Sequence, residues 1–93
     1  MTLLLKDPLA VLDYAVDWAA EYLDGDTLEQ SEWTVEPDET GGIVLVGGAF
    51  EPGQAVVKAG GGVAGHIYRL TNHVVLASGR EDSRSIHLRV EKR

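Results

Sequence analysis

Residues 67–76 read Ile-Tyr-Arg-Leu-Thr-Asn-His-Val-Val-Leu, and this stretch decides the fold class. Its side chains alternate with a period of two, which places Tyr68, Leu70, Val74 and Leu76 on one face. Of the side chains at positions 67, 69, 71 and 73 on the opposite face, only Ile67 is apolar. The pattern predicts a strand with one buried face and one face toward solvent.

The next stretch, residues 83–92, repeats this alternation, with Ile86, Leu88 and Val90 on its apolar face. The connection between the two stretches is short and polar and contains a glycine, as β-hairpin loops do. Upstream, the sequence predicts further strands at residues 27–35, 42–46 and 54–57. Turn signals recur about every 8–12 residues, which is typical of a β-sandwich or a barrel.

Residues 8–24 fit two structures. Asp7 before a proline is a good helix N-cap, and Gly25 would serve as a C-terminal stop. The segment from Leu12 to Trp18 also alternates like a half-buried strand. Helix propensity favours the first structure, and the pattern alone leaves both open.

The chain of 93 residues is long enough for one small domain, which we expect to span residues 1–93 with a flexible tail at residues 1–6. Hydrophobic residues make up 44% and charged residues 25%, which is ordinary for a globular domain and argues against disorder. The absence of cysteine excludes disulfides and thiolate chemistry. We expect neither a membrane span nor a signal peptide, because no apolar run is long enough and no basic leader precedes residues 3–5.

Charge is unevenly distributed along the chain. Eight Lys and Arg against fifteen Asp and Glu give a net charge of −7, which argues against a protein that binds nucleic acid by neutralising phosphates. Residues 1–40 carry a net charge of −10 and residues 41–93 a net charge of +3. The two halves could pair within one fold, face solvent, or form an acidic and a basic face that dock between subunits.

Three groups of residues suggest binding sites, and none completes one. Residues 60–65 spell G-x-G-x-x-G, but an alternating strand pattern follows, whereas a dinucleotide site needs a helix there. His73 and His87 are expected on the outward faces of adjacent strands, where they could approach each other, but two imidazoles do not complete a zinc site. Asp13 and Asp17 are best explained as an acidic solvent face. We therefore expect no metal, no cofactor and no enzyme activity.

Three large side chains, Trp18, Trp33 and Tyr68, are expected to anchor the core. Tyr68 lies early in a late strand, shortly after Gly65, where sandwiches of the immunoglobulin type often place a tyrosine corner. The sequence predicts that Trp33, Tyr68, Leu70, Leu88 and Val90 are buried.

An ordered run of short motifs spans residues 6–90 and resembles a family of small phage and prophage proteins described as fiber–tail adaptor or neck proteins. The motifs, in order, are Lys6-Asp7-Pro8, Leu12-Asp13-Tyr14, Asp17-Trp18, Gly25-Asp26-Thr27, Trp33-Thr34-Val35, Ala64-Gly65, Tyr68, Thr71-Asn72, Gly79-Arg80 and Ser85. The resemblance implies an all-β, immunoglobulin-like sandwich of six to seven strands, with room for a short N-terminal helix or helical turn. It also implies that residues 12–18 form the first strand, with a turn or short helix at residues 19–23.

The resemblance further implies a non-enzymatic structural component of a phage or prophage virion. Its partners would be other neck, tail or fiber proteins or copies of itself, and we expect no nucleic acid or membrane among them. It would lie in the virion, and in the cytoplasm of the bacterial host before assembly. An alternative is a small adhesion or carbohydrate-binding sandwich module, and a third class is a prophage regulator whose acidic surface mimics nucleic acid.

The charge asymmetry suggests which residues would assemble. The candidate assembly surface comprises Arg69, Arg84, Arg89, Asp13 and Asp17. Because exposed ion pairs contribute only about 0.2–1 kcal/mol each, we expect a monomer in dilute solution.

Overall fold

The computed structural model describes residues 3–19 and 25–92, and these residues form seven strands and no helix. The bounds are β1 (Leu3–Lys6), β2 (Leu12–Asp17), β3 (Leu28–Glu36), β4 (Ile43–Glu51), β5 (Gln54–Gly61), β6 (Ile67–Leu76) and β7 (Glu81–Val90). Every strand expected from the sequence is present, and β4 and β5 extend further than the apolar runs that predicted them.

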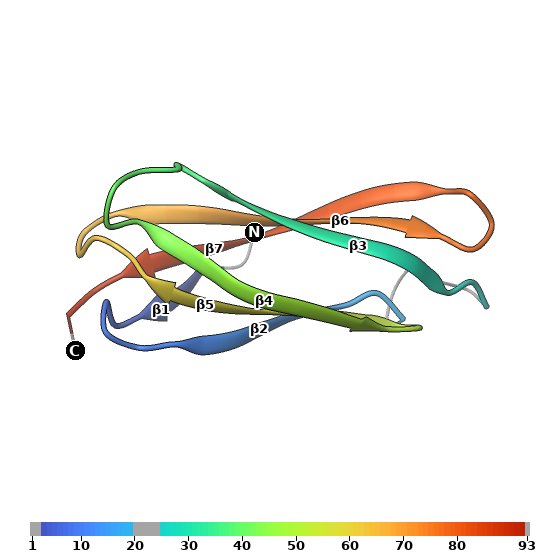
Figure 1. Ribbon diagram of the computed structural model, residues 1–93, viewed down its shortest axis with the longest axis horizontal. Helices are drawn as coiled ribbons and strands as arrows, with labels where there is room; N and C mark the ends of the chain where they lie inside the picture. The colour runs from blue at the N-terminus through green and yellow to red at the C-terminus, as the bar shows by residue number, and fades with distance from the viewer. Residues whose placement is uncertain (1–2, 20–24, 93) are drawn as a thin grey trace.

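The strands form two sheets that pack face to face (Figure 1). One sheet has the order β1-β7-β6-β3 and the other the order β2-β5-β4. The pair β1–β7 is parallel and the remaining pairs are antiparallel. The result is an elongated sandwich of 41 × 20 × 17 Å, with β3 and β4 as the edge strands on one long side.

The core lies between the two sheets, where the apolar residues of each alternating strand meet. Tyr68, Leu70, Leu88 and Val90 are buried, as predicted. Trp33 is only partly buried, because it lies on the edge strand β3, and it packs against both clusters of core residues. Burial of each large apolar side chain contributes roughly 1.5–3 kcal/mol, so these positions supply most of the driving force for the fold.

A polar contact lies inside one of the two clusters of core residues, the cluster formed by Val16, Trp18, Leu28, Ala55, Val74 and Leu76. The indole Nε1 of Trp18 donates a hydrogen bond to Oδ1 of Asn72 at 2.8 Å, and both side chains are fully buried. The amide nitrogen of Asn72 donates to Oγ of Ser31 and to the backbone carbonyl of Glu32. These bonds satisfy polar groups that would otherwise be costly to bury, and they connect β2 and its following residues to β6 and β3.

The N-terminal region differs from the expected flexible tail, and it adopts one of the two structures that fitted residues 8–24. Residues 3–6 of the expected flexible tail form β1, because the backbone pairs with β7 and the side chain of Lys6 is buried. The Nζ atom of Lys6 donates to the carbonyls of Asp7 and Gly61. Of the two structures predicted for this segment, helix and strand, Leu12–Asp17 forms the strand, and Tyr14 and Val16 face the core. The turn or short helix expected at residues 19–23 lies largely outside the described residues.

The glycine-rich segment joins β5 to β6, as its strand context predicted, and no helix follows it. Gly62 has a φ of 108°, and a Cβ atom at this position would lie 2.6 Å from Cγ2 of Val90. Glycine is therefore required here by both backbone conformation and space. The loop is fixed further by Tyr68, whose hydroxyl accepts a hydrogen bond from the backbone N–H of Val63 at 2.9 Å. This contact is the tyrosine corner that the position of Tyr68 suggested.

Candidate functional site

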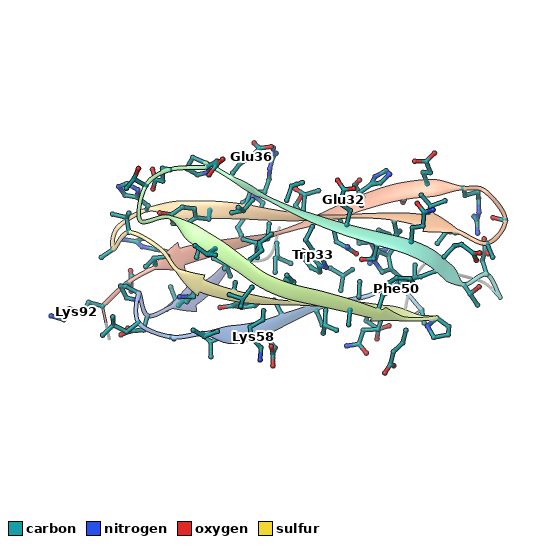
Figure 2. The ribbon with its side chains drawn as sticks, in the orientation of Figure 1. Glu32, Trp33, Glu36, Phe50, Lys58 and Lys92 are labelled. Atoms are coloured by element: carbon teal, nitrogen blue, oxygen red, sulfur yellow. The ribbon has the colours of Figure 1, made fainter. Side chains whose placement is uncertain are left out.

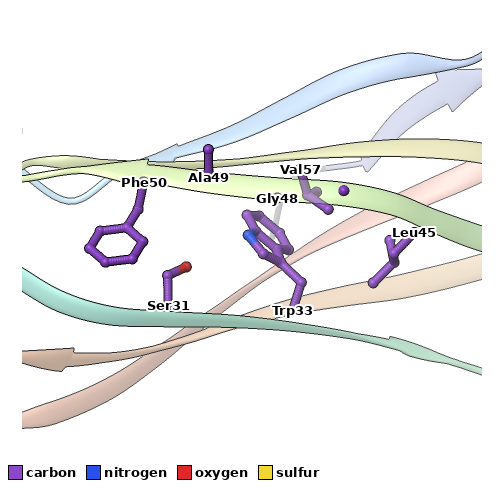
Figure 3. A pocket seen from close by; sticks show the side chains of 8 residues that line it. Ser31, Trp33, Leu45, Gly48, Ala49, Phe50 and Val57 are labelled. Atoms are coloured by element: carbon purple, nitrogen blue, oxygen red, sulfur yellow. The ribbon is translucent and has the colours of Figure 1, made fainter.

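The long side of the sandwich between β3 and β4 is open. A groove of about 490 Å³ runs along it and is lined by Ser31 and Trp33 of β3, by Leu45 and Phe50 of β4, and by Val57 behind them. Figure 3 shows the indole of Trp33 reaching across toward β4, with Phe50 beside it. The side chains that line the groove are mostly apolar, and it lies between two edge strands, so it is a candidate site for contact with another molecule.

Two adjacent glycines shape β4 at this groove. Gly48 pairs with the inward-facing Val57, so its missing side chain leaves space over Trp33. Gly47 pairs with Lys58 on the outer face, where an added Cβ atom would meet no atom within 4 Å. A second hollow, of about 410 Å³, lies on that outer face. The strand is therefore bare of side chains on both faces at the same point.

Trp33 is the largest side chain of the groove. Its Nε1 atom is buried and finds no hydrogen-bond partner among the described residues, whereas Nε1 of Trp18 donates to Asn72. Phe50 is 41% exposed, which is high for a phenylalanine on the inward side of a strand. The groove thus has one covered aromatic side chain and one that is accessible.

Acidic side chains lie along both strands that border the groove. Strands β3 and β4 contain Glu29, Glu32, Glu36 and Glu51 and no basic residue. Arg69 of β6 forms an ion pair with Glu36 at 2.8 Å. In the part of the chain that the structure describes, no basic side chain forms an ion pair with Glu29, Glu32 or Glu51. Figure 2 shows Glu32 and Trp33 on opposite sides of β3. This edge of the sandwich is therefore negatively charged.

Two hydrogen-bonded carboxylates hold the ends of the sandwich. Oε1 of Glu39 accepts from the Tyr68 hydroxyl at 2.6 Å and lies 2.7 Å from Nδ1 of His66. These contacts, the bond from Tyr68 first, lower the pKa of Glu39. Burial, reinforced by the hydrogen bond to Glu39, raises the pKa of Tyr68. The network fixes the loop before β4 to the start of β6, which is a structural role.

At the other end, Asp26 anchors the β6–β7 hairpin. Its carboxylate accepts from the side-chain hydroxyl and backbone N–H of Ser78 and from the guanidinium of Arg80. Led by the hydroxyl of Ser78, these bonds lower the pKa of Asp26 to about 2. Asp26 therefore remains ionised over the whole physiological pH range.

The histidines do not come together. His73 pairs across the hairpin with Ser83, and His87 pairs with Arg69, so the two rings are four positions apart along the strands, roughly 13 Å. The expectation that they could approach each other is wrong, because the hairpin register sets them apart. Among residues 3–19 and 25–92, no three His, Asp or Glu side chains gather in a way that could hold a metal ion. The same residues include no helix long and apolar enough to cross a membrane.

The sequence pattern of one protein family matches residues 6–89 of the chain, and that family is described as "Podophage GP4 fiber-tail adaptor protein gp77". The chain belongs to this family. A comparison with curated proteins finds no significant match.

The fold of this Gp77 family member is shared with a solved structure described as the "Solution structure of the PKD domain from KIAA 1837 protein". The TM-score is 0.55 and the sequence identity 17%, with 98% of this chain and 79% of the other chain covered. This likeness confirms the all-β, immunoglobulin-like sandwich that the resemblance implied.

The candidate assembly surface of the Gp77 family member is spread over three faces. Arg69 and Arg89 lie on the outer face of the four-stranded sheet, and each already forms an intramolecular ion pair, with Glu36 and Glu91 respectively. Asp13 and Asp17 lie on the outer face of the opposite sheet. The structure brings neither group to the other within one chain, so any pairing between them would join two molecules.

The fifth residue of that surface, Arg84, faces inward. Its guanidinium carbon lies 4.9 Å from the ring centroid of Trp18, and it pairs in register with the buried Asn72. This position makes Arg84 part of the packing around Trp18 rather than of an outer basic face.

Sequence reasoning missed the groove between β3 and β4. The strand predicted at residues 42–46 stops before Gly47 and Gly48, and Phe50 was not singled out. The signal that could have found them is the pair of apolar segments on either side of the glycines, which together read as one long strand with no side chains at its centre.

Proposed function

We propose that the protein is a non-enzymatic structural component of a phage or prophage virion that joins fibers to the tail by protein–protein contacts. The observation that carries this proposal is the match of the fiber-tail adaptor family to residues 6–89. The chain would act in the assembled virion, after synthesis in the cytoplasm of its bacterial host.

The geometry supports a role in assembly. The core between the two sheets gives a rigid body, and the open side between β3 and β4 offers a groove lined mainly by apolar side chains, with free strand edges. Apolar area buried at such an edge supplies affinity, and the surrounding charges influence orientation and encounter rate. Partners are therefore other neck, tail or fiber proteins, or further copies of the chain.

The experiment that tests this function interrupts the gene in the phage that encodes the chain and restores it from a plasmid. We expect DNA-filled particles that lack fibers and no longer adsorb to host cells, with both defects repaired by the plasmid copy. Electron microscopy of negatively stained particles measures fiber number directly. Particles that carry a full set of fibers without the chain would contradict the proposal.

A carbohydrate-binding module is the second candidate, and the aromatic lining of the groove favours it. Phe50 is accessible and Trp33 lies beside it, as in shallow sugar sites. Trp33 is largely covered, however, so its ring face is not presented as a stacking platform. Binding on a glycan array that Phe50→Ala abolishes would favour this candidate over an adaptor.

A further inference from the structure

The edge of β4 is free over a continuous run of residues. β4 hydrogen-bonds to β5 on one side and is the last strand of its sheet on the other. A register shift between Leu45 and Gly47 marks a bulge, and beyond it Gly47–Glu51 pair without interruption with residues 54–58 of β5. Within the described residues, the other side of this run makes no backbone hydrogen bond. Unpaired donors and acceptors of this kind are a template for an additional strand.

The two hollows match the side-chain pattern of such a strand. Side chains of an extended segment alternate between the two faces of a sheet. A strand added along Gly47–Glu51 would send alternate side chains to the inner groove beside Trp33 and to the outer hollow beside Val46 and Val56. Figure 3 shows the same alternation in β4 itself, where Phe50 and Ala49 project to opposite sides. The glycines keep both hollows open, since any larger side chain there would occupy one of them.

Charge decides which occupant fits. On the outer face of β4, Glu51 forms no ion pair within the described part of the chain, and Asp13 and Lys58 both line the outer hollow. Glu32 pairs in register with His73 on the outer face of the other sheet, so it points away from the groove. Asp13 is itself held only by Lys58, at 4.0 Å and with both side chains more than half exposed. A second copy joined edge to edge through β4 would bring together two chains that each carry a net charge of −7, which is unfavourable. The complementary occupant is a segment that alternates apolar residues with Lys or Arg.

We propose that the free edge of β4 binds an extended segment of a partner protein, with apolar side chains in the groove beside Trp33 and basic side chains on the outer face beside Glu51 and Asp13. This inference deepens the proposed function, because it names the kind of segment through which a virion partner would attach. Main-chain hydrogen bonds would supply affinity, and the two hollows would select the side chains.

The binding test uses a synthetic peptide of about eight residues, the length of an ordinary strand, in which valine alternates with lysine. A matched peptide alternates valine with glutamate. We expect the lysine peptide to shift the amide resonances of residues 47–51 and the indole resonance of Trp33, and the glutamate peptide to leave them unchanged. Shifts confined to β1 and β2, or equal shifts from both peptides, would overturn the proposal.

Two kinds of variant separate binding from folding. Gly48→Val fills the inner hollow. A Cβ atom at this position would make ordinary contacts with the carbonyl oxygen of Val56 at 3.4 Å and with Cδ1 of Trp33 at 3.6 Å, so the fold should be kept. The added side chain should weaken binding of the lysine peptide about tenfold. Ala64→Val is the control, because it adds a similar side chain on the exposed β5–β6 loop and should have no effect. Glu32→Lys is the charge control, because this exposed side chain lies on the outer face of the other sheet and should leave the peptide preference unchanged. The double variant Glu51→Lys and Asp13→Asn changes only exposed side chains at the β4 edge and its outer hollow, so it keeps the fold and should reverse the preference between the two peptides. Unchanged preference in this variant would contradict the charge argument.

Particles carrying the same variants distinguish this inference from the proposed function. If deletion of the gene removes the fibers and Gly48→Val removes them too, while Ala64→Val does not, the β4 edge is the attachment site. If deletion removes them but Gly48→Val and the charge reversal leave them in full number, the adaptor function stands and the β4 proposal is wrong. If deletion leaves the fibers in place, the adaptor function itself fails.

Discussion

At the scale of single residues, the protein is stabilised by a few buried polar contacts whose loss is not easily compensated. Asn72 is the clearest example, because one side chain bonds Trp18 of one sheet layer and Ser31 and Glu32 of the other. Asp26 plays a similar part at the surface, where it holds the hairpin through Ser78 and Arg80. Each of these residues belongs to a motif that the resemblance to phage adaptors includes, and the structure gives a physical reason for both.

Asn72→Ala should lower the free energy of unfolding by about 1–3 kcal/mol, because it leaves Nε1 of Trp18 buried without an acceptor. Urea denaturation followed by tryptophan fluorescence measures this loss. Ser31→Ala is the comparison, since it removes one hydrogen bond from Asn72 but leaves Trp18 satisfied, and its effect should be smaller. If the two substitutions lower the free energy of unfolding equally, the hydrogen bond to Trp18 contributes no more than the bond to Ser31.

The pH dependence of stability should report Asp26. Its folded-state pKa of about 2 lies below the ordinary value of 3.8, so the carboxylate stabilises the fold fully at pH values above about 4. That contribution is lost as the pH falls from about 4 toward 2, because the proton then binds the unfolded chain first. In Asp26→Asn the stability difference from wild type should be constant above pH 4 and shrink below it. A difference that stays constant down to pH 2 would contradict this role.

At the scale of elements, the alternation of apolar and polar side chains predicted the central strands well. It predicted the edge strands and the course of the glycine-containing segments poorly. Residues 67–76 form β6 as expected, because the alternation places four apolar side chains and Asn72 on one buried face. β1 was missed since Leu3, Leu4 and Leu5 show no alternation, and the strand exists through its parallel pairing with β7. The groove was missed for a related reason. Glycine usually signals a turn, and only the pairing of Gly47 with Lys58 and of Gly48 with Val57 shows that here it continues a strand.

Gly47→Ala should raise the free energy of unfolding by about 0.5–1 kcal/mol, because alanine loses less backbone entropy in a strand and its Cβ atom would meet no neighbour. Thermal denaturation followed by circular dichroism is a sufficient measurement. Gly62→Ala is the matched control and should destabilise, since its φ is 108° and Val90 occupies the space. If Gly47→Ala also destabilises, this part of β4 is more strained than its open surroundings indicate.

At the scale of the whole molecule, the charge asymmetry is largely internal. Much of the basic C-terminal half is paired with acidic residues of its own chain, as with Arg69 and Glu36, or packed on Trp18, as with Arg84. Within the described residues, three acidic side chains that form no ion pair, Glu29, Glu32 and Glu51, belong to β3 and β4, the strands that border the edge where we propose that a partner binds.

The isolated protein should be a monomer at micromolar concentration, at low and at high salt, because exposed ion pairs of about 0.2–1 kcal/mol cannot hold copies together. Light scattering coupled to gel filtration should give the mass of one chain, 10.0 kDa. The variant Arg69→Glu with Arg89→Glu tests whether the outer basic pair contributes, and Arg84 is left unchanged because it packs on Trp18. A dimer at low salt that this variant or added salt dissociates would instead support docking between acidic and basic faces.

The most direct test of the account is a cryo-electron microscopy map of the purified particle at the junction between tail and fiber. We predict density for a two-layered sandwich of about 41 × 20 × 17 Å at that junction, with an extended segment of a neighbouring protein along the β4 edge. A junction in which fibers attach to the tail with no such sandwich between them, or particles from which the chain is absent, would contradict the account.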